Sequence, residues 1–247
     1  MSKHTPCNQV PSRRVRAEAT RKYGLAWALR AGDGVARDPR RALALFLEAA
    51  EAGHLGGQYS AAHMLATGDG VRRNYRKAAE LYALAAARGD APAMYNLARR
   101  YEYGQGVPKN PRTALRWYRK CAQTGDAEAA AAVGDFYFEG LGVDRNYRQA
   151  ARWYAAAADQ NEPRALLQLG YMAREGLGRR ADAVFAVGCY RRAARRGECS
   201  AMYNLALCLL VGEGTRRDRR AARHWLEKAA AQGNRSAQNR LKKEGWR

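Results

Sequence analysis

Six pairs of glycines recur along the chain, each pair 36 residues after the one before it. No insertion or deletion interrupts the interval, and the pairs are Gly32 and Gly34, Gly68 and Gly70, Gly104 and Gly106, Gly140 and Gly142, Gly176 and Gly178, and Gly212 and Gly214. A fixed period of this size indicates a stack of identical supersecondary units, each burying its apolar face against its neighbours. Such stacks usually present an extended binding surface rather than a catalytic pocket.

One repeat, taken at residues 91–126, contains two predicted helices. Its first part places apolar side chains such as Met94 and Leu97 at helical spacing, and Gly104 is the residue type that ends a helix in the left-handed conformation. A second helix is predicted over residues 111–123. The chain is rich in Ala and has only four Phe, which favours closely packed helices over a sheet. The sequence therefore predicts an all-α fold, an α-solenoid (α/α superhelix) of six 36-residue helix-turn-helix repeats.

The start of each second helix carries a capping residue. The six positions hold only Asp or Asn: Asp38, Asn74, Asn110, Asn146, Asp182 and Asp218. The side-chain oxygen of such a residue accepts a hydrogen bond from a backbone N–H of the first helical turn. Pro39 and Pro111 follow two of the caps, at the first helical position, where a missing N–H costs nothing. Replacement of one cap by Ala is expected to cost about 1 kcal/mol.

The body of each second helix also repeats. An alanine stands four residues and again twelve residues after every cap, and between the two lies a bulky side chain: Phe46, Tyr82, Tyr118, Tyr154, Tyr190 or Leu226. Small residues let helices approach closely, so we interpret these positions as the interface between hairpins, with the bulky residue wedged into the neighbour. The helices are predicted to end at Gly53, Gly89, Gly125, Asn161, Gly197 and Gly233. Asn is the next residue type after Gly that tolerates a left-handed helix end.

These positions together resemble a known repeat. The pattern A-x-x-x-L-[GA]-x-x-[YL], then G-x-G-V, then [ND]-x-x-x-A-x-x-[WL]-Y-x-x-A-A-x-x-G is similar to the Sel-1-like repeat, a branch of the tetratricopeptide-like helical repeats. The resemblance implies an adaptor or scaffold for protein complexes, and does not imply any one partner. We expect a disordered basic tail at residues 1–16 and a C-terminal capping helix and basic end at 235–247. Between them we expect six repeats at about residues 17–53, 54–89, 90–125, 126–161, 162–197 and 198–234.

The resemblance also implies where a partner would bind. In tetratricopeptide-like arrays the first helices line a concave groove, and three positions around the Leu of L-[GA] face it. The candidates are Tyr59, Ser60 and His63; Tyr95, Asn96 and Arg99; Ala131, Ala132 and Asp135; Leu167, Gln168 and Tyr171; and Tyr203, Asn204 and Leu207. Amide side chains there would bind a peptide backbone, and Arg99 an acidic group. The alternative is that these positions only follow the packing pattern of the repeat.

Charge is distributed unevenly along the chain, whose net charge is +21. Residues 163–247 hold 19 basic and 7 acidic residues, a net +12. Two clusters at equivalent places in neighbouring repeats are expected to form one basic ridge without intramolecular partners: Arg191, Arg192, Arg195, Arg196, Arg216, Arg217, Arg219, Arg220 and Arg223. An acidic protein segment would suit the ridge, and so would the phosphates of RNA, although no aromatic residues interleave with these arginines for base stacking. Plain solvation, or an anionic membrane surface, is a further alternative.

No constellation of residues points to catalysis, so the chain is expected not to be an enzyme. The glycine pairs follow helices and lack the further Gly and acid of a phosphate loop. The histidines His4, His54, His63 and His224 are scattered, and the five cysteines lack metal-ligand spacing. We therefore expect no metal and no cofactor.

The compartment and the state of assembly can also be predicted. Cys121 and Cys189 fall on apolar helix positions, as in a reducing compartment, and no apolar run is long enough to span a bilayer. We expect a cytoplasmic monomer without integral membrane contact, or a matrix protein of an organelle if the basic N-terminus is a transit peptide.

The fifth repeat departs from the pattern of the others. Arg179 replaces the Val after the second Gly, Cys189 stands where other repeats have Trp, and Gly188 enters the middle of the second helix. A mid-helix Gly costs about 1 kcal/mol against Ala. We hypothesise that local opening of the stack begins in this repeat.

Overall fold

The computed structural model describes residues 12–246, and within them every regular element is an α-helix. The chain divides into two compact units, one up to Trp117 and one from Tyr118, so that the boundary falls inside helix α6 (Pro111–Ala122). The all-α solenoid predicted from the 36-residue period is confirmed.

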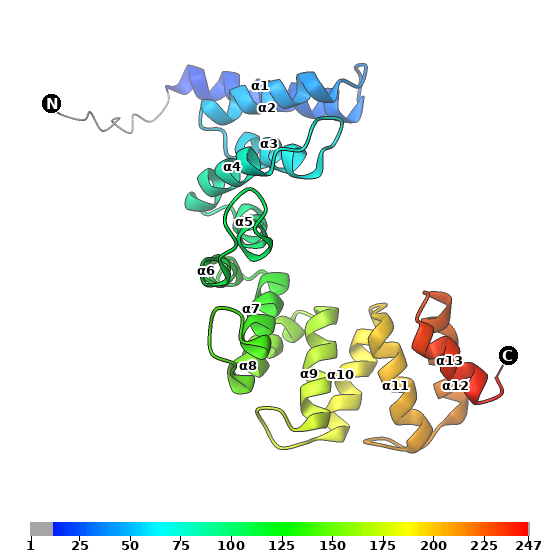
Figure 1. The fold of residues 1–247 in the computed structure, drawn as a ribbon. Coiled ribbons are helices and arrows are strands. Elements are labelled where there is room, and N and C mark those ends of the chain that lie inside the picture. Colours follow the sequence, from blue (N-terminus) through cyan, green and yellow to red (C-terminus); the bar gives the residue numbers. More distant parts are fainter. Residues whose placement is uncertain (1–11, 247) are drawn as a thin grey trace. The chain divides into compact units, whose positions relative to one another are not determined.

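The first unit contains five complete helices, which pack in chain order (Figure 1). They are α1 (Arg13–Ala31), α2 (Pro39–Glu51), α3 (Leu55–Thr67), α4 (Tyr75–Ala87) and α5 (Ala91–Tyr103). Among these five, each helix contacts its neighbours in the chain. This nearest-neighbour packing is the arrangement of a solenoid, in which stability is a sum over repeats and their interfaces.

The second unit continues the same pattern through seven further helices. They are α7 (Ala127–Glu139), α8 (Tyr147–Asp159), α9 (Pro163–Glu175), α10 (Ala183–Arg195), α11 (Cys199–Val211), α12 (Arg219–Ala231) and α13 (Arg235–Lys243). Again each helix packs on its neighbours in the chain. The odd-numbered helices are the first helices of the repeats, and α13 stands at the place of a seventh first helix.

The N-terminal boundary differs from the expectation. The tail was expected to run through residue 16, but α1 begins at Arg13, and Ser12 caps it by accepting from the backbone N–H of Val15 at 3.4 Å. The run of basic residues at 13–16 does not prevent a helix, because the serine supplies a cap and Arg is a good helix former. Residues 1–11 of the expected tail, with His4 and Cys7, lie outside the described residues.

All six predicted caps are confirmed. Asp38, Asn74, Asn110, Asn146, Asp182 and Asp218 each accept, through the side-chain oxygen, from the backbone N–H three residues on, at 2.8–3.0 Å. Each of these residues also donates its own backbone N–H to a carbonyl near the end of the preceding first helix, as Asp182 does to Ala173 at 2.8 Å. One residue thus starts the second helix through its side chain and closes the loop through its backbone N–H.

The core is built from the predicted interface positions. The alanines four residues after each cap are fully buried, and so are the bulky residues that follow them, from Phe46 to Leu226. Cys121 and Cys189 are buried as expected, and the four described cysteines are free thiols. Burial raises the pKa of the Cys189 thiol to about 11, so this cysteine behaves as a packed apolar side chain rather than a nucleophile.

The ends of the second helices are also confirmed. The glycines predicted there all have positive φ, and Asn161, with φ 58°, is the one non-glycine residue among residues 12–246 that does. Asn tolerates the left-handed region better than most residues because its short side chain can hydrogen-bond locally. Here its Oδ1 accepts from Arg192 Nη2 at 3.0 Å.

Candidate protein-binding surfaces

The first-helix face of the N-terminal unit carries five of the predicted groove residues on α3 and α5. Tyr59, His63, Tyr95 and Asn96 are half-buried and Arg99 is exposed. Asn96 of α5 is close enough to Tyr59 of α3 to act on its pKa, which burial raises and the Asn96 side chain partly lowers. The Asn96 amide donates to the carbonyl of Pro92 at 2.9 Å. Asn96 is therefore already engaged, and the exposed surface beside it is mainly aromatic.

Two aromatic residues of the first repeat extend this face, and our sequence analysis missed them. Tyr23 and Trp27 on α1 occupy the register of Tyr59 and His63, and Trp27 is 42% exposed. Tyr23 packs against His54 with a centroid separation of 4.5 Å, and Trp27 packs edge-on against Phe46 at 5.8 Å. Counting one further 36-residue step back from Tyr59 would have found both.

A charged cluster closes one end of the same face. Arg30 Nε donates to Asp69 Oδ2 at 2.7 Å, and Arg37 Nη2 donates to the other carboxylate oxygen at 3.1 Å. The Arg30 guanidinium also lies 4.8 Å from the centroid of the Trp27 ring. Burial, followed by the charge of Arg30, lowers the pKa of His63. A neutral imidazole on this face can donate or accept one hydrogen bond from a partner.

Three of the predicted groove positions are wrong. Ser60, Ala131 and Ala132 are buried, so they cannot meet a partner. Ala131 and its neighbours lie in an alanine run of α7, in which the six consecutive residues from Ala129 to Gly134 are all buried. At these positions the packing pattern of the repeat prevails, which was the alternative interpretation.

In the C-terminal unit, the first-helix face runs over α9 and α11. Gln168, Tyr203, Asn204, Leu167 and Leu207 are half-buried, and Tyr171 is exposed. A pocket of about 460 Å³ opens on this face and is shared by three first helices. It is lined by Arg174 and Glu175 of α9, Leu207 and Val211 of α11, Glu213 of the loop after α11, and Arg240 of α13. Val211 is 68% exposed. The pocket offers an apolar wall between charges of both signs.

Asp135, also predicted to face the groove, belongs to a network that joins three helices. Its carboxylate accepts from the hydroxyl of Tyr154 at 2.7 Å and forms an ion pair with Arg164. Burial raises the pKa of Tyr154, so this hydroxyl keeps its proton and remains a donor. The network ties α7 to α8 and α9, and it leaves Asp135 committed to the fold rather than to a partner.

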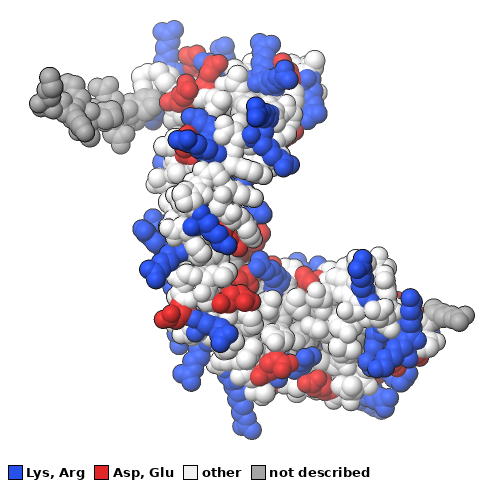
Figure 2. All heavy atoms as spheres, viewed as in Figure 1, with Lys and Arg blue, Asp and Glu red and all other residues white. Residues whose placement is uncertain are grey.

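The basic ridge of nine arginines differs from the expectation in two ways. Three of its members have partners: Arg192 donates to the carbonyl of Ala158 at 2.6 Å, Arg219 pairs with Glu244 at 2.9 Å, and Arg223 pairs with Glu227 at 2.8 Å. Within the described part of the chain, no hydrogen bond or ion pair engages the other six side chains, which are those of Arg191, Arg195, Arg196, Arg216, Arg217 and Arg220. Figure 2 shows basic side chains gathered over the last helices of this unit.

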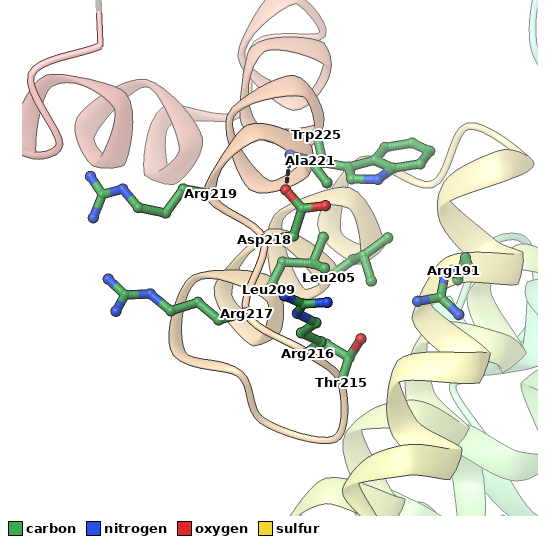
Figure 3. Close-up of a pocket in the computed structure, with 10 residues that line it drawn as sticks. All are labelled: Arg191, Leu205, Leu209, Thr215, Arg216, Arg217, Asp218, Arg219, Ala221 and Trp225. Atoms are coloured by element: carbon green, nitrogen blue, oxygen red, sulfur yellow. Dashed lines mark hydrogen bonds between the residues drawn. The ribbon is translucent and has the colours of Figure 1, made fainter.

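The second difference is that only part of the ridge lines a common pocket, and within it Arg217 and Arg219 extend away from Arg191 and Arg216. Arg191, Arg216, Arg217 and Arg219 line one pocket of about 620 Å³, together with Leu205, Leu209, Thr215, Asp218, Ala221 and Trp225 (Figure 3). Arg195 lies one helical turn beyond Arg191, about 6 Å further along the axis of α10. We expected no aromatic residues to interleave with these arginines. This is wrong, because Trp225 of α12 lines the same pocket as the arginines of the loop before α12.

Among residues 12–246, no three His, Cys, Asp or Glu side chains are grouped in a way that could hold a metal ion. No helix in that range combines the length and the apolar character that crossing a bilayer requires.

Comparison with a library of protein families gives six consecutive matches to the Sel1 repeat. They cover residues 17–54, 56–90, 91–126, 127–162, 163–198 and 199–234. Together these segments include nearly all of the described chain and follow the 36-residue period of the glycine pairs. No curated protein sequence matches the chain closely enough to count as a relative.

Solved structures with the same arrangement of helices include a protective antigen present in uropathogenic Escherichia coli strains, which displays an SLR fold. It is 33% identical to this chain with a TM-score of 0.87, over 91% of this chain and 48% of the antigen. The chain thus spans about half the length of that protein. A Sel1 repeat protein from Oxalobacter formigenes is 28% identical with a TM-score of 0.78, over 88% of this chain and 87% of its own.

Proposed function

Because this chain belongs to the Sel1 repeat family, whose members are generally scaffolds for protein–protein interaction, we propose that it is a non-enzymatic scaffold that binds an extended segment of a partner protein along its first-helix faces. In each unit the binding surface is formed by neighbouring first helices. We propose that the protein acts as a cytoplasmic monomer with protein partners.

The observation that carries this proposal is the character of the exposed first-helix residues. Tyr95, Tyr203 and Trp27 present half-exposed rings, and amide side chains such as Gln168 and Asn204 lie beside them. Aromatic residues dominate the binding energy of protein interfaces, and amides can pair with a peptide backbone. An extended segment can contact such residues on successive first helices, because they recur at a regular spacing.

Charge supports an acidic segment as the partner. Arg99 is exposed on the face of the N-terminal unit, and Arg174 and Arg240 line the pocket on the face of the C-terminal unit. The net charge of +12 in residues 163–247 would also accelerate the encounter with an acidic partner. The pocket lining includes Glu175 and Glu213 as well. The face would therefore select a partner by where its acidic groups lie, rather than by the partner's net charge.

A pull-down from lysate, with and without nuclease, tests the proposal. The bait pair is the wild type and a Tyr95→Ala, Tyr203→Ala variant, matched by a control in which the exposed Leu84 of α4, a second helix, is changed to Ala. We expect the wild type and the control to retain a discrete protein partner after nuclease treatment, and the face variant to lose it. Retention by all three would exclude the first-helix faces.

The second candidate function is binding of RNA through the C-terminal arginines. One observation favours it, namely that Trp225 lines one pocket with Arg191 and Arg216 and could stack on a base. The nuclease arm separates the two functions, because material that disappears from the wild-type pull-down after nuclease treatment would be bound through nucleic acid.

A further inference from the structure

The pocket between Arg191 and the loop before α12 opens on the other side of α11 from the first-helix face. Its α11 lining residues are Leu205 and Leu209, whereas the first-helix face carries Tyr203 and Leu207. Residues two apart on a helix differ by about 200° in direction, so the two pairs point to opposite sides. A ligand in this pocket would therefore not compete for the surface proposed above.

The rim of this pocket is strongly basic. Arg216 of the loop and Arg191 of the facing side of α10 lie on either side of the opening, whereas the side chains of Arg217 and Arg219 extend away from Trp225 (Figure 3), and Arg219 pairs with Glu244. The one acid in the lining, Asp218, is held by its capping bond to the backbone N–H of Ala221 at 2.8 Å. Arg191, Arg216 and Arg217 have no partner among the described residues, so their donors are available to carboxylates.

The floor of the pocket is apolar. Leu205 and Leu209 are buried under it, and Trp225 forms one wall with part of its ring exposed. The Lys228 ammonium lies 5.2 Å from the centroid of the Trp225 ring, which adds a further positive charge at this wall. An arginine rim around an apolar floor fits a side chain that is apolar itself and has acidic neighbours.

The preceding repeat has a smaller pocket of about 350 Å³ in the same register. Its lining includes Leu169, equivalent to Leu205, and Arg179, equivalent to Thr215, together with Arg148, Arg152 and Phe185. The Arg179 guanidinium lies 4.5 Å from the centroid of the Phe185 ring. Two pockets of like chemistry, one repeat apart within one unit, suit an extended chain that places apolar side chains at intervals between acids.

We propose that this outer face, comprising the pocket lined by Arg191, Arg216, Arg217 and Trp225 and its smaller neighbour, is a second docking site for an acidic peptide segment with interspersed aromatic side chains. The proposal goes beyond the first-helix function and does not depend on it. The chemistry favours peptide over RNA, because a stacking platform needs successive open rings, whereas Phe185 and Trp225 each have a cation of the protein over the ring.

Fluorescence anisotropy with a short labelled peptide that repeats Asp-Glu-Phe tests the proposal on the full chain at physiological ionic strength, where exposed charges are screened. The variant is Arg216→Glu, Arg217→Glu. The matched control is Arg195→Glu, Arg196→Glu, which changes the net charge equally at exposed arginines outside the pocket. We expect the pocket variant to weaken binding at least about tenfold, as the loss of charge-assisted hydrogen bonds predicts, and the control by less than about threefold.

A second peptide, repeating Asp-Glu-Ala, tests the apolar floor, and we expect it to bind the wild type about tenfold more weakly than the Phe peptide. Equal weakening by both charge variants, or equal binding of both peptides, would overturn the proposal and indicate an unspecific basic surface.

Tighter binding of labelled oligouridylate than of the Phe peptide, lost in the pocket variant, would assign the site to RNA instead. The Tyr203→Ala variant should bind the Phe peptide normally, so failure here and failure of the first-helix function remain distinguishable. Thermal unfolding of each variant verifies that it is folded.

Discussion

Repeats four and five lie next to each other in the C-terminal unit and are built from helices of equal length, 13 residues each, yet their buried tyrosines differ. Tyr154 in repeat four donates to Asp135 at 2.7 Å. Tyr190 in repeat five is equally buried, and its hydroxyl has no partner among residues 12–246. The position equivalent to Asp135 is Tyr171. The caps and the alanines therefore suffice to reproduce the backbone, while the polar chemistry between helices changes from repeat to repeat.

The difference also affects stability. Repeat four has a network that ties Asp135 to Tyr154 and to Arg164 of the next repeat. Repeat five has a buried hydroxyl without a bond, and Gly188 in the middle of α10. An unsatisfied buried polar group costs about 1–3 kcal/mol. The comparison supports the hypothesis that repeat five is the less stable of the two, and four predictions test it.

The largest effect is expected at the loop between α9 and α10 in repeat five, which packs against the start of α8 in repeat four. Gly178 has φ +74°, and a Cβ there would lie 2.6 Å from the carbonyl carbon of Tyr147, at the start of α8. Gly178→Ala should lower the free energy of unfolding by about 3 kcal/mol, from left-handed strain plus a backbone clash. Gly197→Ala is the control, since Gly197 also has positive φ but open space around it, and it should cost about 1 kcal/mol. Urea unfolding curves that coincide for the two variants would contradict the close approach of the two repeats.

The two tyrosines should respond differently to the loss of their hydroxyls. Tyr154→Phe removes a hydrogen bond to a charged acceptor and should cost about 1.5 kcal/mol. Tyr190→Phe removes a buried hydroxyl without a partner and should be neutral or stabilising. Urea unfolding of both variants measures the contrast, and an equal loss in both would show that Tyr190 also has a bond worth keeping.

Introducing into repeat five the acid that repeat four has at the equivalent position should recover part of the difference in stability. Tyr171 is exposed, so Tyr171→Asp can place a carboxylate near the Tyr190 hydroxyl without opening the core. We expect a gain of about 1 kcal/mol in the wild-type background and no gain in the Tyr190→Phe background. A gain of the same size in both backgrounds would mean that the new charge acts elsewhere.

The smallest effect is expected at Gly188, where an added Cβ would meet no atom within 4 Å. Gly188→Ala should stabilise the protein by up to about 1 kcal/mol through helix propensity. Amide hydrogen exchange should show α10 less protected than α8 in the wild type and equally protected in the variant. Equal protection already in the wild type would contradict local opening in repeat five.

The sequence predicted the features that depend on one residue type at one position. A cap needs a short side-chain oxygen and a left-handed helix end needs Gly or Asn, so Asp182 and Asn161 could be assigned from the repeat alone. The bulky wedge could be assigned as well, because Tyr154 and its equivalents sit between two alanines at helical spacing.

The surfaces were predicted less well, because they depend on how neighbouring helices meet. Ala131 shares the register of Tyr95 and Tyr203, and Ser60 shares that of Asn96 and Asn204, yet both are buried, since exposure depends on the size of the surrounding side chains. Arg192 looked like a free ridge residue, and only the packing of α10 against α8 shows that it bonds to Ala158. Trp225 reaches the arginines through the fold of the loop, which periodicity does not encode.

Photo-cross-linking tests the central claim, binding of a partner along the first-helix faces, most directly. A photoreactive phenylalanine analogue is placed at Tyr95, at Tyr203 or, as a control on a second helix, at Leu84, which is 53% exposed. Irradiation in cells that make the protein is followed by nuclease treatment and denaturing gels. We predict one discrete protein adduct, with the same partner, from the positions of Tyr95 and Tyr203 and none from that of Leu84. Equal adducts from all three positions, or adducts that nuclease removes, would contradict the account.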